Sequence, residues 1–147
     1  MSDRASHDMF NRLVSARDRT AAGKTLEVFG WVCLMEAIVV MMSPGFVASA
    51  LHLPAFTEQG AAYFRLAALL VGGVGMLYVV SGRLGSEEFV FASLLDRPLV
   101  PPAMAVLWYL GVVPGPLAFA FSIQDFSGFL WTLHAWRAQR ATVAVAH

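Results

Sequence analysis

The sequence predicts an all-α, polytopic membrane protein folded as a four-helix bundle. Apolar and aromatic residues make up 58% of the 147 residues, and charged residues only 14%, against about 25% charged in soluble domains. The mean hydropathy of +0.64 indicates more apolar side chains than a small core can hide. Four apolar stretches approach the roughly 20 residues that a membrane-spanning helix needs. Ten basic and ten acidic residues balance, which gives no indication of nucleic-acid binding.

Proline and glycine separate the predicted spans, which are residues 26–43, 61–82, 98–113 and 116–136. The third span is short, and we expect it to extend backwards through residues 88–95. Pro44 and Gly45 end the first span, because proline lacks a backbone donor. Residues 46–53 are then predicted to form a short interfacial helix. A connection of only about three residues at 114–116 makes spans three and four antiparallel neighbours.

Basic residues predict that both termini face the cytoplasm of a bacterial-type inner membrane. They occur before the first span, between spans two and three, and after span four, and the two opposite loops carry none. We divide the chain into a basic cytoplasmic arm (1–24), a membrane domain (25–137) and a cytoplasmic tail (138–147). The arm is either an amphipathic helix on anionic headgroups or a disordered leader. A cleaved signal peptide ending at residues 48–50 is a minor alternative.

Three ionisable residues fall inside the predicted spans: Glu36, Arg65 and Asp125. A charge in the bilayer costs at least about 2.5–3.5 kcal/mol, so each is a functional candidate. Lys24 to Glu36 and Asp125 to Arg137 are both twelve residues, which places the two acids in one layer about 18 Å from the inner boundary. Arg65 is expected about 9 Å further out, from where its long side chain could bend inward or snorkel outward.

We therefore expect Glu36, Arg65 and Asp125 to form one polar cluster with Tyr109 and Gln124. Two carboxyl groups and one guanidinium leave a surplus negative charge, so the cluster is expected to hold a proton or a ligand. Two alternatives stay open. Arg65 pairs with one acid as a structural pin between helices, or it snorkels to the lipid headgroups.

No motif for a cofactor, a metal or hydrolytic chemistry is found in the sequence. Cys33 is the only cysteine, and no paired histidine spacing suits haem or zinc. The sequence contains no Gly-x-Ser-x-Gly elbow and no phosphate-binding glycine loop. The glycines of the second span, Gly72, Gly73, Gly75 and Gly82, instead indicate close helix packing.

The chain resembles the small DoxX-like membrane proteins. The resemblance depends on the placement of Glu36 in the first span and on three sequence segments. These are Tyr63-Phe64-Arg65-Leu66-Ala67, the connection 83–98, and Gln124-Asp125-Phe126-Ser127-Gly128 followed by Leu130-Trp131-Thr132. It implies a compact four-helix membrane bundle, in some members an accessory partner of redox or catabolic systems. It implies no catalytic residue.

The favoured functional hypothesis is a non-catalytic accessory or assembly partner of a redox or catabolic membrane system. Its partners would be the lipid bilayer and either a second copy of the chain or a membrane enzyme, contacted through small-residue helix faces. The alternative is a binder or carrier of a small apolar or aromatic molecule or a quinone, oriented by Glu36, Arg65, Asp125 and Tyr109. An enzyme that uses the surplus acid as a general base is the third hypothesis.

Overall fold

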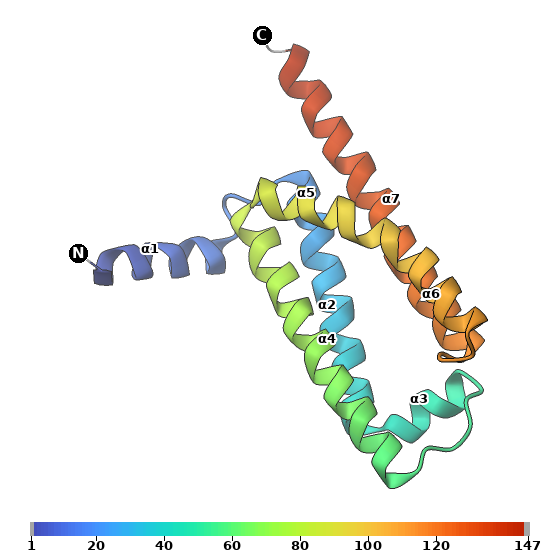
Figure 1. Cartoon of the computed structure of the whole chain (residues 1–147). Coiled ribbons are helices and arrows are strands. Elements are labelled where there is room, and N and C mark those ends of the chain that lie inside the picture. Colours follow the sequence, from blue (N-terminus) through green and yellow to red (C-terminus); the bar gives the residue numbers. More distant parts are fainter. Residues whose placement is uncertain (1, 146–147) are drawn as a thin grey trace.

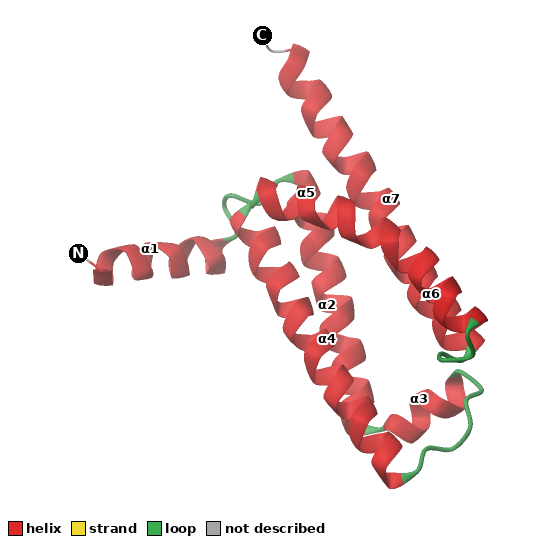
Figure 2. Cartoon of the chain, in the orientation of Figure 1, coloured by secondary structure: helices red, strands yellow, loops and turns green. Residues whose placement is uncertain are grey.

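The computed structural model describes the backbone of residues 2–145 and the side chains of residues 6–142, and its regular structure in this range is entirely helical (Figure 2). This confirms the predicted all-α class. The chain order is shown in Figure 1. The helices are α1 (Ser2–Ser15), α2 (Ala21–Met42), α3 (Pro44–Ala50), α4 (Glu58–Leu84), α5 (Glu87–Asp96), the 3-10 turn η1 (Arg97–Leu99), α6 (Val100–Tyr109) and α7 (Gly115–Val145).

Three helical segments in the described range are long and apolar enough to cross a membrane. They are Ala21–Met42, Glu58–Leu84 and Glu87–Tyr109. The last joins α5, η1 and α6, so the predicted backward extension of the third span is confirmed. Helix α7, with 31 residues, is long enough but is not among them. Gln124 and Asp125 lower its hydropathy, and a fourth crossing by α7 stays a prediction.

Helices α2 and α4 form an antiparallel pair whose backbones meet at two pairs of glycines (Figure 1). Gly30 lies against Gly75, and Gly23 lies against Gly82. A Cβ atom added to Gly75 would lie 2.8 Å from the Gly30 carbonyl oxygen. On each helix the two glycines are seven residues apart, which is about two turns, so they share one face. Small residues allow this close approach of the backbones, which confirms the predicted packing role of Gly75 and Gly82. The prediction was wrong for Gly73, where an added Cβ would meet no atom within 4 Å.

The buried core lies where α5 and α7 meet the α2–α4 pair. It contains Ala22, Leu26, Phe29, Cys33, Tyr78, Val90 and Leu94. The Tyr78 ring packs between two phenylalanines, with ring centroids 5.2 Å from Phe29 and 5.0 Å from Phe89. These contacts join α2, α4 and α5 at one end of the molecule. The same end holds the start of α2 and the end of α4 (Figure 1).

The third apolar segment bends between α5 and α6 (Figure 1). Pro98 lies in η1, and Pro101 and Pro102 lie in the first turn of α6. Proline removes backbone donors, so the helix changes direction here. Helix α6 then runs beside α7, and residues 110–114 connect them. This confirms that the segments joined by the short turn are antiparallel neighbours.

Helices α1 and α3 lie outside the long helices. Helix α2 ends at Met42 and α3 starts at Pro44, so the predicted break at this proline is confirmed, although α3 ends at Ala50 rather than at residue 53.

The amino-terminal arm contains a helix, α1, which points away from the other helices (Figure 1). An ion pair of 2.7 Å between Arg12 and Asp18 ties the end of α1 to the following turn.

Candidate functional site

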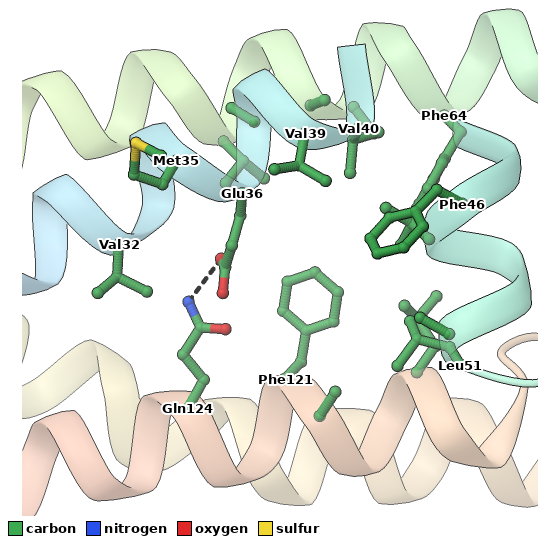
Figure 3. A pocket seen from close by; sticks show the side chains of 18 of the residues that line it. Val32, Met35, Glu36, Val39, Val40, Phe46, Leu51, Phe64, Phe121 and Gln124 are labelled. Atoms are coloured by element: carbon green, nitrogen blue, oxygen red, sulfur yellow. Dashed lines mark hydrogen bonds between the residues drawn. The ribbon is translucent and has the colours of Figure 1, made fainter. Parts of the chain in front are cut away.

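An apolar cavity of about 630 Å³ lies between α2, α3, α4 and α7 (Figure 3). Its walls carry aliphatic and aromatic side chains from all four helices. The lining includes Trp31, Val32, Met35, Val39, Phe46, Leu51, Phe64, Val71, Leu117, Ala120 and Phe121. Glu36 is the one ionisable side chain in the lining that the structure describes, and Gln124 is its neighbour. The cavity is therefore apolar with a single polar site.

Glu36 and Gln124 form the polar pair of this cavity. Gln124 Nε2 donates a hydrogen bond of 2.8 Å to Glu36 Oε2 (Figure 3). The same nitrogen lies 3.9 Å from Cys33 Sγ. Both contacts engage the amide nitrogen with α2, so Gln124 Oε1 takes no part in the bond to Glu36. Both residues are half-buried, and the pair links the middle of α2 to the middle of α7.

Helix periodicity explains how α7 contributes to the cavity. Leu117, Phe121 and Gln124 are spaced four and three residues apart, which places them on one face of the helix. Helix α3 closes the end of the cavity with Phe46 and Val47. Its position follows from the break at Pro44, which turns the chain out of α2 toward the connection between α6 and α7 (Figure 1).

Asp125 is half-buried and does not line the cavity. It is one residue beyond Gln124, which turns it by about 100° around α7. The positive charge of Arg97 acts on the Asp125 carboxylate, and so does the negative charge of Glu36. Within the described part of the chain, Asp125 forms no ion pair. The structure thus brings Gln124, rather than Asp125, into contact with Glu36.

Arg65 and Tyr109 lie apart from the Glu36–Gln124 pair. Arg65 is exposed, and its Nε donates a hydrogen bond of 3.2 Å to the Met41 carbonyl oxygen near the end of α2. This contact ties α4 to α2, but no acid among the described residues pairs with Arg65. Tyr109 is 88% exposed at the end of α6. Of the five residues expected to cluster, Glu36 and Gln124 are in direct contact.

Arg97 is a buried cation that sequence reasoning assigned only to a cytoplasmic loop. Its side chain is completely buried. The guanidinium carbon lies 3.7 Å from the Phe29 ring centroid and 4.7 Å from that of Tyr78. Nη1 donates a hydrogen bond of 3.3 Å to Thr132 Oγ1, whereas Nε and Nη2 have no partner. Gly128 makes room, because a Cβ there would lie 2.8 Å from Nη1.

Glu27 is the second polar residue whose role the sequence did not indicate. It is only 5% exposed. Its two carboxylate oxygens accept hydrogen bonds of 2.8 Å from Arg19 and from Arg83. These ion pairs connect the start of α2 with the end of α4. Glu27 therefore stabilises the helix pair from the end opposite to α3.

The cavity combines apolar walls with one pair of hydrogen-bonding side chains, a combination typical of sites for small, largely apolar molecules. Among the described residues there is no group of three or more side chains that could hold a metal ion.

No family model, curated protein or solved structure matches the chain. The resemblance to the DoxX-like proteins stays a prediction.

Proposed function

We propose that the chain is a membrane protein that binds a small, largely apolar molecule in the cavity around Glu36 and Gln124. The observation that carries this proposal is the cavity itself. Its volume of about 630 Å³ falls within the range of about 300–1,000 Å³ typical of ligand sites. Like such sites, it combines apolar walls with very few polar groups. This is the binder or carrier hypothesis, with the polar end reduced from the expected cluster of Glu36, Arg65, Asp125 and Tyr109 to the Glu36–Gln124 pair.

Several side chains that line the cavity are also exposed, which supports entry of a ligand from the surrounding bilayer. Trp31, Met35 and Phe46 line it and are 48%, 58% and 64% exposed. In a membrane these side chains would face acyl chains, so an apolar molecule dissolved in the bilayer would reach the cavity without crossing water. A quinone belongs to this class of ligand.

The accessory hypothesis is the second candidate function. It depended on small-residue faces free to contact a partner or a second copy of the chain. In the structure Gly75 and Gly82 of α4 are in contact with α2, so this face is used within the chain. We therefore favour ligand binding, and a partner such as a redox or catabolic membrane enzyme would have to contact another surface.

We further propose that α7 is a fourth crossing and that both termini face the cytoplasm of a bacterial-type inner membrane. The distribution of charge supports this topology. Arg19 precedes α2 and Arg83 lies in the last turn of α4, so both lie at the end of the molecule where α5 packs, whereas the described loops at the α3 end carry no arginine or lysine. Positive residues concentrate on the cytoplasmic side of membrane proteins.

Cysteine labelling tests this topology. In a Cys33→Ser background, Ala55→Cys and Ser15→Cys place single thiols at exposed positions on opposite ends of the molecule. We expect a membrane-impermeant maleimide to label the first variant in intact cells and the second only after the membrane is opened. Labelling of both thiols in intact cells would contradict the proposed topology.

Filling the cavity tests the proposed function. Ala120 lines the cavity and is half-buried, so Ala120→Trp places an indole in the space that a ligand would occupy. We expect naphthylmethanol, a neutral apolar probe, to bind the purified protein in maltoside detergent. We expect its Kd to rise by at least about tenfold in the Ala120→Trp variant. Equilibrium dialysis against a detergent blank measures both values.

Ala103→Trp is the matched control, because Ala103 is exposed on α6 and does not line the cavity. This variant is expected to bind the probe as the original protein does. Equal weakening by both tryptophans, or no saturable binding by the original protein, would contradict a ligand site in this cavity.

A further inference from the structure

The polar end of the cavity presents hydrogen-bond acceptors. The Gln124 amide nitrogen is engaged with Glu36 and Cys33. The remaining atoms of the pair are Gln124 Oε1 and Glu36 Oε1, and the hydrogen bonds between described residues at this pair involve neither of them. Carboxylate and amide oxygens accept but do not donate. A molecule bound here is therefore recognised through its own N–H or O–H donors.

The charge around this pair is negative. Glu36 is the ionisable residue of the described lining, and no arginine or lysine among the described residues forms an ion pair with it. Arg65 is held by the Met41 carbonyl oxygen, and Arg97 stacks on Phe29. The charge of Asp125 is opposed by that of the buried Arg97, so the charge without an opposite partner in the cavity lining is that of Glu36. A cationic ligand would supply this partner.

Aromatic rings form part of the cavity wall. Trp31, Phe46, Phe64 and Phe121 line the cavity from four different helices. In Figure 3 the Phe121 ring lies beside Glu36, and Phe46 and Phe64 lie further away at the α3 end. The faces of aromatic rings attract cations as well as packing against apolar groups. Walls of this kind suit the body of a lipophilic cation.

We infer that the molecule bound in this cavity is a lipophilic cation, an apolar and preferably aromatic body that carries a protonated amine. The ammonium group donates to Glu36 Oε1 and Gln124 Oε1 and neutralises the carboxylate, and the apolar body fills the space toward α3. This inference rests on the proposed function and narrows the class of ligand. A neutral alcohol would make the same contacts without the charge, and a carboxylate would be repelled.

Three probes of equal size test the inference: naphthylmethylamine, naphthylmethanol and naphthoate near neutral pH. They share one aromatic body and differ in the polar group, which is a cation, a neutral donor or an anion. We expect the amine to bind about tenfold more tightly than the alcohol, because a charge-assisted hydrogen bond is stronger than a neutral one. We expect the acid to bind most weakly. Dialysis in uncharged maltoside detergent keeps the detergent from favouring one charge.

Glu36→Gln tests whether Glu36 causes the preference for the amine, because the substitution removes the charge and keeps the size of the side chain. We expect the amine to lose its advantage over the alcohol in this variant, and the alcohol to bind as before. Glu58→Gln is the control, because Glu58 is an exposed acid at the start of α4 outside the cavity. It should leave the ranking unchanged.

The outcomes separate this inference from the proposed function. If none of the three probes binds, the proposed function fails. If the alcohol or the acid binds as tightly as the amine, the cavity is a ligand site but the inference is overturned. A cation preference that survives in Glu36→Gln also overturns it. If Glu36→Gln does not fold, the order of the three probe affinities in the original protein tests the inference by itself.

Discussion

Replacing Gly75 with alanine is expected to destabilise the protein by about 1–3 kcal/mol, the cost of overfilling a packed interface. The added Cβ would lie 2.8 Å from the Gly30 carbonyl oxygen and 2.9 Å from Cys33 Cβ. Because one neighbour is a backbone atom of α2, the clash is relieved only if the two helices move apart. The unfolding midpoint in mild detergent, followed by circular dichroism, measures this loss.

Gly73→Ala is the matched control on the same helix. A Cβ at Gly73 meets no atom within 4 Å, and alanine favours a helix over glycine by about 1 kcal/mol. The same substitution two residues away is therefore expected to leave the midpoint unchanged or to raise it. If both variants shift the midpoint equally, close packing at Gly30 and Gly75 does not hold α2 against α4.

Replacing Arg97 with alanine is expected to destabilise the protein by about 1–2 kcal/mol, because the lost ring contacts and the cavity left behind outweigh the relief of two unpartnered buried N–H groups. The guanidinium is completely buried, stacks on Phe29 and donates to Thr132. Its removal leaves a cavity where α2, α4 and α7 meet. It also removes the cation whose charge acts on Asp125. The unfolding midpoint measures the total effect.

A double-mutant cycle with Asp125→Asn separates packing from charge. We expect Asp125→Asn to destabilise the original protein more than the Arg97→Ala variant, because the acid interacts favourably with this arginine. Arg137→Ala is the control, since Arg137 is an exposed arginine of α7. It should change the stability by no more than about 0.5 kcal/mol. If Arg97→Ala is as stable as this control, the buried Arg97 does not stabilise the protein.

The sequence predicted the helical segments well because hydropathy and helix breakers are local signals. Pro44 ends α2, and residues 88–95 extend the third apolar segment. The position of Arg97 could not be predicted in this way. A basic residue between two spans is typical of a cytoplasmic loop, and only the bend at Pro98 and the space at Gly128 bring this arginine into the core.

The sequence predicted the layer in which the candidate site residues lie, but not the helix face on which each side chain lies. Counting residues from the inner boundary put Glu36 and Asp125 in one layer, and Glu36 does contact α7 near this level. Depth does not determine which side of a helix faces a neighbour. Adjacent residues differ by about 100°, so Gln124 faces Glu36 and Asp125 does not. Arg65 was counted as further out, and there it bonds to the Met41 carbonyl oxygen.

The most direct test of the central claim is quenching of Trp31 fluorescence by a brominated naphthyl probe, because bromine quenches only at short range. Trp31 lines the cavity, so the difference between the original protein and Trp31→Phe isolates its signal. The account predicts saturable quenching of this component, and loss of the saturable phase in Ala120→Phe, which fills the same space without adding a second indole. Quenching that rises linearly with probe concentration, and equally in both proteins, would show that the probe dissolves in the detergent and that the cavity is not a binding site.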